Sequence, residues 1–262
     1  MFVAGCDIGS LSAKAVIMKN GDVCASHVIF AKTEPDESAH IVMEEAMKKA
    51  GISVKDIKFC VATGYGRNSV TLADATESEI TCHGRGAHWS MPNIRMVIDI
   101  GGQDAKVIKL DESGKVIRYA YNDRCASGTG RFLEVMANAL DIPVEQMGEI
   151  SLKSKAPITI SNQCIVFAET EIISLVNANR PLPDIVSGLH RALTGRVAAL
   201  AIGIELDKEI TMSGGGAKNI GMFKALEETL GVKLRKMEEI DPQINGALGA
   251  ALIARDLLEK GS

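Results

Sequence analysis

The chain has 262 residues, 46% of them hydrophobic and 24% charged, so it is long enough for a large core and most naturally forms two domains. Its net charge of −4 and its aromatic content of 4% exclude the basic, aromatic-rich surface that a nucleic-acid partner needs. Apolar runs such as 197–204 are too short to span a bilayer, and the first residues lack the basic region of a signal peptide. We therefore expect a cytoplasmic protein without a membrane or nucleic-acid partner.

The chain begins with a pattern that occurs twice. Asp7-Ile8-Gly9-Ser10 is followed by Ala13-Lys14, and ninety-two residues later Asp99-Ile100-Gly101-Gly102 is followed by Ala105-Lys106. The aspartate, glycine, alanine and lysine keep the same spacing without a gap, which indicates an internal repeat. Each copy continues into a second turn and another β-rich run, so each copy predicts an antiparallel meander of three strands.

The rest of the chain alternates between helical and strand segments. After the first meander, such segments lie at 37–50, 57–63 and 69–89. In the second half we expect helices at 132–140, 166–176, 182–204 and 220–230 and from 245 onward, a β-prone run at 158–161, and strands at 209–212 and 232–235. These elements predict an α/β protein of two related halves. The expected first domain is 1–94, completed by a C-terminal helix at 244–262, and the second is 95–243.

An Asp-Ile-Gly turn between two strands is suited to nucleotide phosphates. Its glycine lets the backbone amides approach the phosphates, and its aspartate can hold a hydrated Mg²⁺. Ser10, Ser12 and Lys14 add further donors. A single turn of this kind is explained better by an ordinary hairpin. Two turns in register, with a late glycine turn at 214–216 for the adenosine, indicate a nucleotide site.

This combination resembles the superfamily of acetate and sugar kinases, actin and the seventy-kilodalton heat-shock proteins. The resemblance implies two ribonuclease-H-like domains that hold ATP and Mg²⁺ in a cleft. It implies that Asp7 and Asp99 organise Mg²⁺ or the attacking water, and that Gln103 and Asp104 orient that water. The residues expected to contact the nucleotide are Gly9, Ser10, Leu11, Ser12, Ala13, Lys14, Gly101, Gly102, Gly215, Gly216, Asn219 and Gln243.

Two cysteines, Cys125 and Cys164, each precede a predicted helix, where the free amides and the helix dipole favour a thiolate. A structural zinc site or a cubane iron–sulfur cluster takes four ligands, so two cysteines supply half a set. A twofold dimer would bring two such pairs together. The residues leave two interpretations open: one [4Fe–4S] cluster held by Cys125 and Cys164 of both subunits of a homodimer, or two buried thiols at tight turns.

The other cysteines are spread out, without a CxxC pair, and we expect them to be free. Cys6, Cys24 and Cys60 lie in apolar, strand-like runs and are predicted to be buried as small hydrophobic residues. Cys82 and His83 invite a metal-site interpretation, but adjacent residues point in different directions on a helix, so we expect them to be structural.

Several stretches resemble the activators (component A) of 2-hydroxyacyl-CoA dehydratases, a family akin to the ATPase subunits of benzoyl-CoA reductase. They are Thr63-Gly64-Tyr65-Gly66-Arg67-Asn68, Cys82-His83-Gly84-Arg85-Gly86-Ala87, residues 99–106, residues 122–136 and Cys164-Ile165-Val166-Phe167-Ala168-Glu169. The resemblance covers essentially the whole chain. Ser127 stands where this family more often has alanine, and Asn162-Gln163 stand where Ser-Thr is usual, which indicates a branch with a different partner.

The resemblance implies a homodimer with one bridging [4Fe–4S] cluster and one ATP site per subunit. A ferredoxin or flavodoxin would reduce it. With ATP it would deliver one electron to a 2-hydroxyacyl-CoA dehydratase or to a double-cubane-type reductase. Two alternatives compete with this interpretation: a sugar or amino-sugar kinase of the same superfamily, and a nucleotide-dependent scaffold or sensor.

Overall fold

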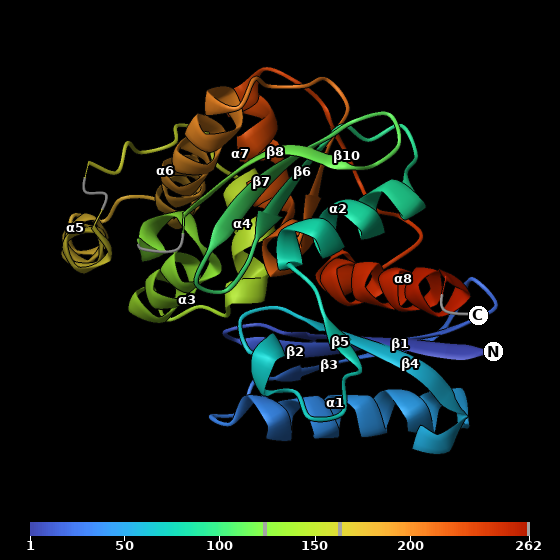
Figure 1. The fold of residues 1–262 in the computed structure, drawn as a ribbon. Helices are drawn as coiled ribbons and strands as arrows, with labels where there is room; N and C mark the ends of the chain where they lie inside the picture. The colour runs from blue at the N-terminus through green and yellow to red at the C-terminus, as the bar shows by residue number, and fades with distance from the viewer. Residues whose placement is uncertain (123–124, 162–163, 261–262) are drawn as a thin grey trace. The chain divides into compact units, whose positions relative to one another are not determined.

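The computed structural model describes residues 1–122, 125–161 and 164–260 (Figure 1). Its first sheet has the strand order β3-β2-β1-β4-β5. Strand β1 pairs antiparallel with β2 and parallel with β4, while β2 pairs antiparallel with β3. The predicted meander of three strands is thus confirmed. The five strands are β1 (Phe2–Ile8), β2 (Ser12–Lys19), β3 (Asp22–Phe30), β4 (Ile57–Thr63) and β5 (Ala75–Thr76).

The second sheet repeats the topology of the first. Its order is β10-β9-β6-β7-β8, and the first sheet read from its other edge is β5-β4-β1-β2-β3. Each strand of one sheet therefore has a counterpart five places later in the chain, as the sequence repeat predicts. The second set is β6 (Met96–Ile100), β7 (Ala105–Leu110), β8 (Val116–Asn122), β9 (Ile210–Ser213) and β10 (Leu234–Arg235).

The chain divides into two compact units. The first comprises Met1–Val97, Ile108–Arg118 and Met237–Ser262, and the second comprises Ile98–Val107 and Tyr119–Lys236. Strands β6, β7 and β8 contribute residues to both units. The domain boundaries expected from the sequence, 1–94 with 244–262 and 95–243, stay a prediction.

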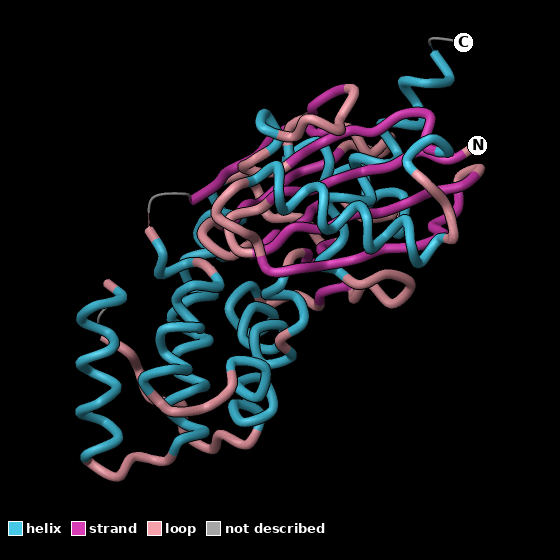
Figure 2. The backbone as a smooth tube through the Cα atoms, turned by 90° about the horizontal axis from the view of Figure 1, so that it is seen from below, coloured by secondary structure: helices cyan, strands magenta, loops and turns pink. Residues whose placement is uncertain are grey.

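In the first unit, helices α1 and α8 cover opposite faces of the first sheet (Figures 1 and 2). Alternate residues of β1 point to opposite faces: Ala4 and Cys6 lie in the core beneath α1, and Val3 lies in the core beneath α8. Helix α2 packs on α8 from the other side. The bounds are α1 (Pro35–Ala50), α2 (Glu79–Ser90) and α8 (Asn245–Lys260), with short 3₁₀ turns η1 (Val54–Asp56), η2 (Arg67–Ser69) and η6 (Pro242–Ile244).

The second unit carries a group of helices in which α6 packs on α4 and α7, and α3 packs on α5. Helix α5 lies at the outer edge of this group in both views (Figures 1 and 2). The α-helices are α3 (Gly130–Ala139), α4 (Met147–Leu152), α5 (Ile165–Asn177), α6 (Leu182–Gly203) and α7 (Ile220–Leu230), and the 3₁₀ turns are η3 (Ala126–Gly128), η4 (Val144–Gln146) and η5 (Gly215–Lys218).

Most predicted elements lie within a few residues of the observed ones, with two exceptions. The segment 69–89 is not one element, because 75–76 pairs with β4 and α2 begins only after Ser78, whose side chain accepts a hydrogen bond from the Ile80 amide. The β-prone run at 158–161 forms no strand; the Ile158 amide instead donates to the Asp184 carbonyl near the start of α6. No described helix is both long enough and apolar enough to cross a bilayer.

The packing of α8 against α2 predicts a sharp stability difference between two glycines. A methyl group on Gly249 would collide with the Cys82 carbonyl of α2, whereas nothing lies within 4 Å of one added to Gly195 of α6. We expect Gly249→Ala to lower the free energy of unfolding by about 1–3 kcal/mol, as overpacking does. Gly195→Ala should raise it by about 0.5–1 kcal/mol through helix propensity. Urea denaturation of both variants tests this, and equal effects would contradict the packing described.

Candidate functional site

In the first copy of the repeat, the aspartate that ends β1 is buried beside a lysine of β2. Asp7 is 4% exposed, and its Oδ2 lies 3.0 Å from Lys14 Nζ, which also donates to the Ser12 carbonyl at 3.3 Å. The Gly9 amide donates to the same carbonyl at 3.0 Å and closes the turn. Breaking a buried ion pair by removing one partner costs about 3–5 kcal/mol, so this pair fixes the shape of the turn.

The second copy repeats this pair with more partners. Asp99 is 2% exposed, and its Oδ2 lies 3.5 Å from Lys106 Nζ. Lys106 also lies 2.8 Å from Asp104, and the Ser213 hydroxyl donates to Asp99 Oδ1 at 2.9 Å. Asp99 and Asp104, both predicted catalytic residues, are thus brought together by one lysine. The Gly101 amide donates to the Asp104 carbonyl at 3.0 Å and closes the second turn.

Each aspartate is in close contact with a glycine that comes just after the neighbouring strand of its sheet. After β4, Gly64 has φ of +84°, and a Cβ there would collide with Asp7 Oδ1. After β9, Gly214 has φ of +79°, and a Cβ there would lie 2.7 Å from Asp99 Oδ1. Both the left-handed backbone and the crowding require glycine. The sequence reasoning found the turn after β9 but missed the role of Gly64, whose signal was the Gly-x-Gly pattern that comes after both strands.

The predicted phosphate-contacting residues are largely on the surface of these turns. Ser10 and Gln103 are exposed, and Gly9, Leu11 and Gly102 are half-buried. Ala13 is an exception: its side chain is fully buried in the core beneath α1, so only its backbone is available to a ligand.

The second turn is bonded to the start of α3. The Gly130 amide donates to the Gly101 carbonyl at 2.9 Å, and the Arg131 amide donates to the Gly102 carbonyl at 2.8 Å. These are amides of the first turn of α3, which have no partner within their own helix. The second turn is therefore tied directly to the start of α3.

The predicted adenosine turn leads into α7. Gly215 is exposed and Gly216 packs against Ile100, while Asn219 Oδ1 accepts from the Gly221 and Met222 amides and caps α7. Asn219 Nδ2 also lies 3.1 Å from Nε2 of His190, a buried residue. The polar atoms of the Asn219 side chain are thus engaged within the protein.

Three other features bear on these turns. Burial lowers the pKa of His190 to about 4, so the ring beside Asn219 is neutral at physiological pH. Gln243 lies in η6 of the first unit, and its backbone amide donates to Asp241 Oδ1 at 2.9 Å.

His83 borders the first aspartate. A Cβ on Gly246 would lie 2.9 Å from both Asp7 Oδ2 and His83 Nε2. Sequence reasoning missed this arrangement.

Cys125 caps η3, the 3₁₀ turn that leads into α3. Its Sγ lies 3.0 Å from the Ser127 hydroxyl and accepts a hydrogen bond of 3.3 Å from Arg196 of α6. The Ser127 hydroxyl and amide and the Arg196 guanidinium together lower the pKa of this thiol. Asn122 holds the backbone on both sides, accepting from the Cys125 amide at 3.2 Å and donating to its carbonyl at 2.8 Å. Cys125 therefore lies in an environment that favours the thiolate.

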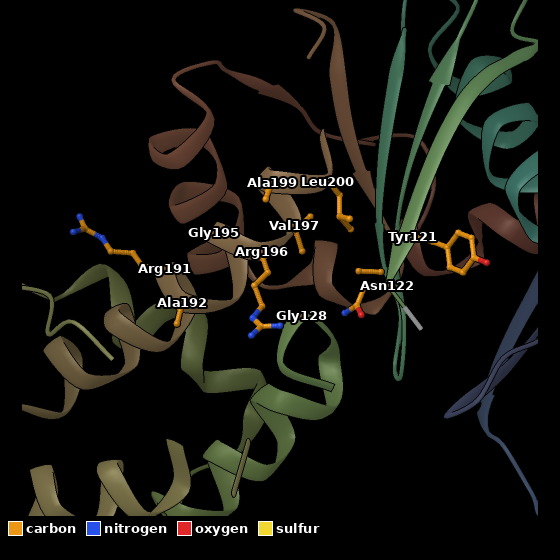
Figure 3. Close-up of a pocket in the computed structure, with 11 residues that line it drawn as sticks. Tyr121, Asn122, Gly128, Arg191, Ala192, Gly195, Arg196, Val197, Ala199 and Leu200 are labelled. Carbon is orange, nitrogen blue, oxygen red and sulfur yellow. The ribbon is translucent and has the colours of Figure 1, made fainter. Parts of the chain in front are cut away.

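A cavity of about 720 Å³ lies beside Cys125, on the face of α6 that carries Arg191, Gly195 and Arg196. Figure 3 shows Arg196 extending from α6 toward η3, where Gly128 lies. Among the residues that the structure describes, the lining includes two arginines and no carboxylate.

Cys164 is exposed and caps the N-terminus of α5, as predicted. This helix has an unusual surface. Val166 and Phe167 are each 62% exposed, and Ile173 and Val176 are 47% and 45% exposed. Large apolar side chains gathered on one exposed helix are a common feature of interaction surfaces.

All six cysteines lie within the described residues and are free, as expected. Cys6 and Cys60 are buried, but the prediction for Cys24 is wrong: this residue lies near the start of β3, at the edge of the sheet, and is exposed. Burial raises the pKa of the Cys60 and Cys82 thiols to about 12. Within the described part of the chain, no group of three or more His, Cys, Asp or Glu residues could hold a metal ion.

The duplicated sheets and paired aspartate turns define an α/β protein of the actin and sugar-kinase class. A solved hexokinase of the ROK family from Thermus thermophilus shares this fold at 15% identity, with a TM-score of 0.53 over the full length of both chains. The predicted fold, two duplicated ribonuclease-H-like halves, is confirmed.

Comparison with known proteins gives the family. The model of the BadF/BadG/BcrA/BcrD ATPase family matches residues 4–254, so the chain belongs to this family and is an ATPase. It is 43% identical to the 2-hydroxyisocaproyl-CoA dehydratase activator of Clostridioides difficile, over 98% of this chain and 96% of that one. It is 42% identical to the (R)-2-hydroxyglutaryl-CoA dehydratase activating ATPase of Acidaminococcus fermentans, over 97% of each.

The solved structure of the Clostridium difficile activator with bound ADPNP superposes with a TM-score of 0.95, at 42% identity, covering 100% of this chain and 97% of that one. The predicted resemblance to dehydratase activators is therefore confirmed.

The environment of Cys125 predicts its reactivity in reduced, metal-free protein. Because its pKa lies below the ordinary 9.0, its thiolate fraction at about pH 7 exceeds that of a normal thiol, and iodoacetamide should alkylate it much faster than buried Cys60 and Cys82. Ser127→Ala should slow alkylation at this pH, by tenfold for each pKa unit regained. Mass spectrometry of the labelled peptides measures this. Ser174→Ala on α5 is the control, and an unchanged rate in Ser127→Ala would contradict the assignment.

Proposed function

We propose that this ATPase is a one-electron donor that activates an iron–sulfur acceptor enzyme, through a [4Fe–4S] cluster bound by Cys125 and Cys164 of two copies of the chain. The observation that carries the proposal is the placement of these two cysteines, each capping a helical turn in one unit, one within reach of an arginine and the other at the surface. The acceptor is a 2-hydroxyacyl-CoA dehydratase or a double-cubane-type reductase. The relatives named as dehydratase activators support the first choice. The electron donor is a ferredoxin or flavodoxin.

The donor set of the chain fits half of such a cluster. A cubane takes four thiolates, and this chain offers two at helical N-termini, where the dipole favours negative charge. The Cys125 sulfur accepts a hydrogen bond from Arg196 and lies 3.0 Å from the Ser127 hydroxyl, which could donate to a thiolate ligand. Cys164 is exposed in the single chain. This is required of a ligand whose cluster is completed by a second subunit. When bound, the cluster would accept and release single electrons.

The exposed apolar face of α5 supports a homodimer as the assembly. The helix begins at Cys164, and Val166 and Phe167, close behind it in the chain, are each 62% exposed. A second copy of the chain that shares a cluster at Cys164 would lie next to this face and cover it. The same contact thus completes the ligand set and buries the patch.

For the ATPase, we propose that Asp7 and Asp99 organise Mg²⁺ or the attacking water and that Gln103 and Asp104 orient that water. Both aspartates are held rigidly by lysines, which keeps their carboxylates in place during turnover. The backbone of the two turns, with Ser10, Ser12 and Lys14, would bind the phosphates. Gly215, Gly216, the Asn219 backbone and Gln243 would contact the nucleoside.

The hydrogen bonds between the second turn and α3 supply a route from nucleotide to cysteine. Gly101 and Gly102 accept from the first amides of α3, and Cys125 caps the 3₁₀ turn directly before that helix. A change of phosphate ligands at the turn would shift α3 and with it the Cys125 loop. We propose that ATP acts on electron transfer by this route.

Iron content tests the cysteine assignment. Anaerobically prepared wild-type protein should hold about four irons per two chains, with a brown colour that dithionite bleaches. Cys125→Ala and Cys164→Ala should each lose the iron and weaken the dimer. Cys24→Ala, which removes another exposed thiol, is the matched control and should keep both. Iron-free wild-type protein, or a fully active monomer, would end the proposal.

Nucleotide dependence tests the coupling. We expect Asp99→Asn to lower the rate of ATP hydrolysis on the order of 10²-fold or more, because loss of a group that acts directly in a reaction has an effect of this size. The iron content should stay the same. Glu112→Gln, an exposed carboxylate in the same meander, should hydrolyse ATP normally. Thermal unfolding checks that Asp99→Asn is folded. Equal reduction of the acceptor by wild-type protein with ADP alone and with ATP would refute the coupling.

A further inference from the structure

Two side chains from different elements of the second unit lie within hydrogen-bond distance of the Cys125 sulfur. Ser127 belongs to the same 3₁₀ turn, and its hydroxyl lies 3.0 Å from the sulfur. Arg196 lies on α6, 71 residues further along the chain, and its Nη1 donates to the sulfur at 3.3 Å. Ser127 therefore belongs to the turn that follows the cysteine, and Arg196 belongs to a separate helix.

Hydrogen bonds to a ligand sulfur have a defined effect on an iron–sulfur centre. Reduction adds negative charge that is partly carried by the sulfurs, so a donor stabilises the reduced form more than the oxidised form and raises the reduction potential. A guanidinium adds its positive charge to this effect. Loss of either donor makes reduction less favourable and makes the reduced protein a stronger electron donor.

We propose that Ser127 and Arg196 are positioning residues that set the reduction potential at Cys125, and that the Arg196 hydrogen bond is the one that ATP binding breaks. The proposal rests on the proposed function, since it requires Cys125 to be a cluster ligand. It assigns two side chains to the control of the reduction potential. The contribution of Ser127 is the same in both nucleotide states, whereas the contribution of Arg196 depends on the nucleotide.

The connections of each element distinguish the two donors. The amides of Gly130 and Arg131 tie α3 to the carbonyls of the second phosphate turn, and η3 with Cys125 and Ser127 precedes α3 directly. A shift of that turn therefore carries the cysteine and Ser127 together. Arg196 is anchored on α6, so the same shift would lengthen the bond from Arg196 to the sulfur.

Arg196 borders both η3 and an open space. A Cβ on Gly128 of η3 would lie 3.7 Å from the Cβ of Arg196. The Arg196 side chain lies along the cavity of about 720 Å³ shown in Figure 3. The direction also suits the function: the bond is present while the protein accepts an electron and absent when it must deliver one.

Arg191 provides a matched control for charge. It lines the same cavity on the same helix, but its Nη2 donates to Glu228 at 2.9 Å rather than to the cysteine. Removing Arg191 takes away the same charge from the same cavity and leaves both donors on the sulfur.

The test is a redox titration, followed by electron paramagnetic resonance, of the anaerobically prepared dimer. Wild type, Ser127→Ala, Arg196→Met and Arg191→Met are compared with ADP and with a non-hydrolysable ATP analogue, after iron content is confirmed. Ser127→Ala should lower the equilibrium constant for reduction about threefold to tenfold in both nucleotide states, where tenfold equals 59 mV for one electron. Ser127→Thr, which keeps the hydroxyl, should behave as wild type.

Arg196→Met should lower the same constant about threefold to tenfold with ADP but not with the ATP analogue, a range again set by 59 mV per tenfold. The difference between the two nucleotide states should therefore shrink in this variant, while Arg191→Met keeps the wild-type difference. If Arg196→Met does not assemble the cluster, Arg196→Gln takes its place with the same criteria.

The outcomes separate this inference from the proposed function. Wild-type protein without iron would refute both. Iron-containing variants with wild-type potentials in both nucleotide states would overturn the inference alone. So would an Arg191→Met variant that shifts as much as Arg196→Met, because the effect would then be one of charge rather than of the hydrogen bond.

Discussion

The structure depends on one arrangement used twice: an aspartate at the end of a central strand, buried against a lysine of the next strand. Asp7 and Asp99 are 4% and 2% exposed, and their carboxylates lie 3.0 Å and 3.5 Å from the ammonium groups of Lys14 and Lys106. Desolvation makes each pair expensive to break, at about 3–5 kcal/mol for the loss of one partner, so the turn between the two strands has a fixed shape. Under the proposed function, these turns present preorganised amides and carboxylates to the nucleotide.

The two copies differ in the element that succeeds the meander. In the first, β3 is succeeded by α1, which packs on the sheet and only stabilises it. In the second, β8 is succeeded by η3 and α3, whose first amides bond to the phosphate turn. The duplication therefore supplies two turns of similar structure, and the second is hydrogen-bonded to a helix that follows Cys125. Under the proposed function, this asymmetry confines redox control to one unit, while the turn of the other unit serves the nucleotide alone.

Sequence reasoning succeeded where the signals are local. Helix α7 spans the predicted 220–230, because Asn219 caps its start and Gly231, with φ of +68°, ends it. It failed where distant partners decide the structure. Residues 75–76 form a strand because β4 pairs with them, and 158–161 form none because α6 takes their hydrogen bond. The contact of Gly64 with Asp7 was missed for the same reason: 57 residues separate the two, and only the parallel pairing of β1 with β4 brings them together.

The chemical character of Cys125 illustrates the same limit at the level of function. Its position before a helix is visible in the sequence and predicts a thiolate, but a helix dipole alone is a weak influence that acts on every helix. The specific donors are Ser127, two residues away, and Arg196, which α6 delivers from 71 residues away. Under the proposed function, the motif contains the cysteine and Ser127, but it does not contain Arg196, the second group at the sulfur. The element in which to look for adaptation to a particular electron acceptor is then α6 rather than the cysteine motif.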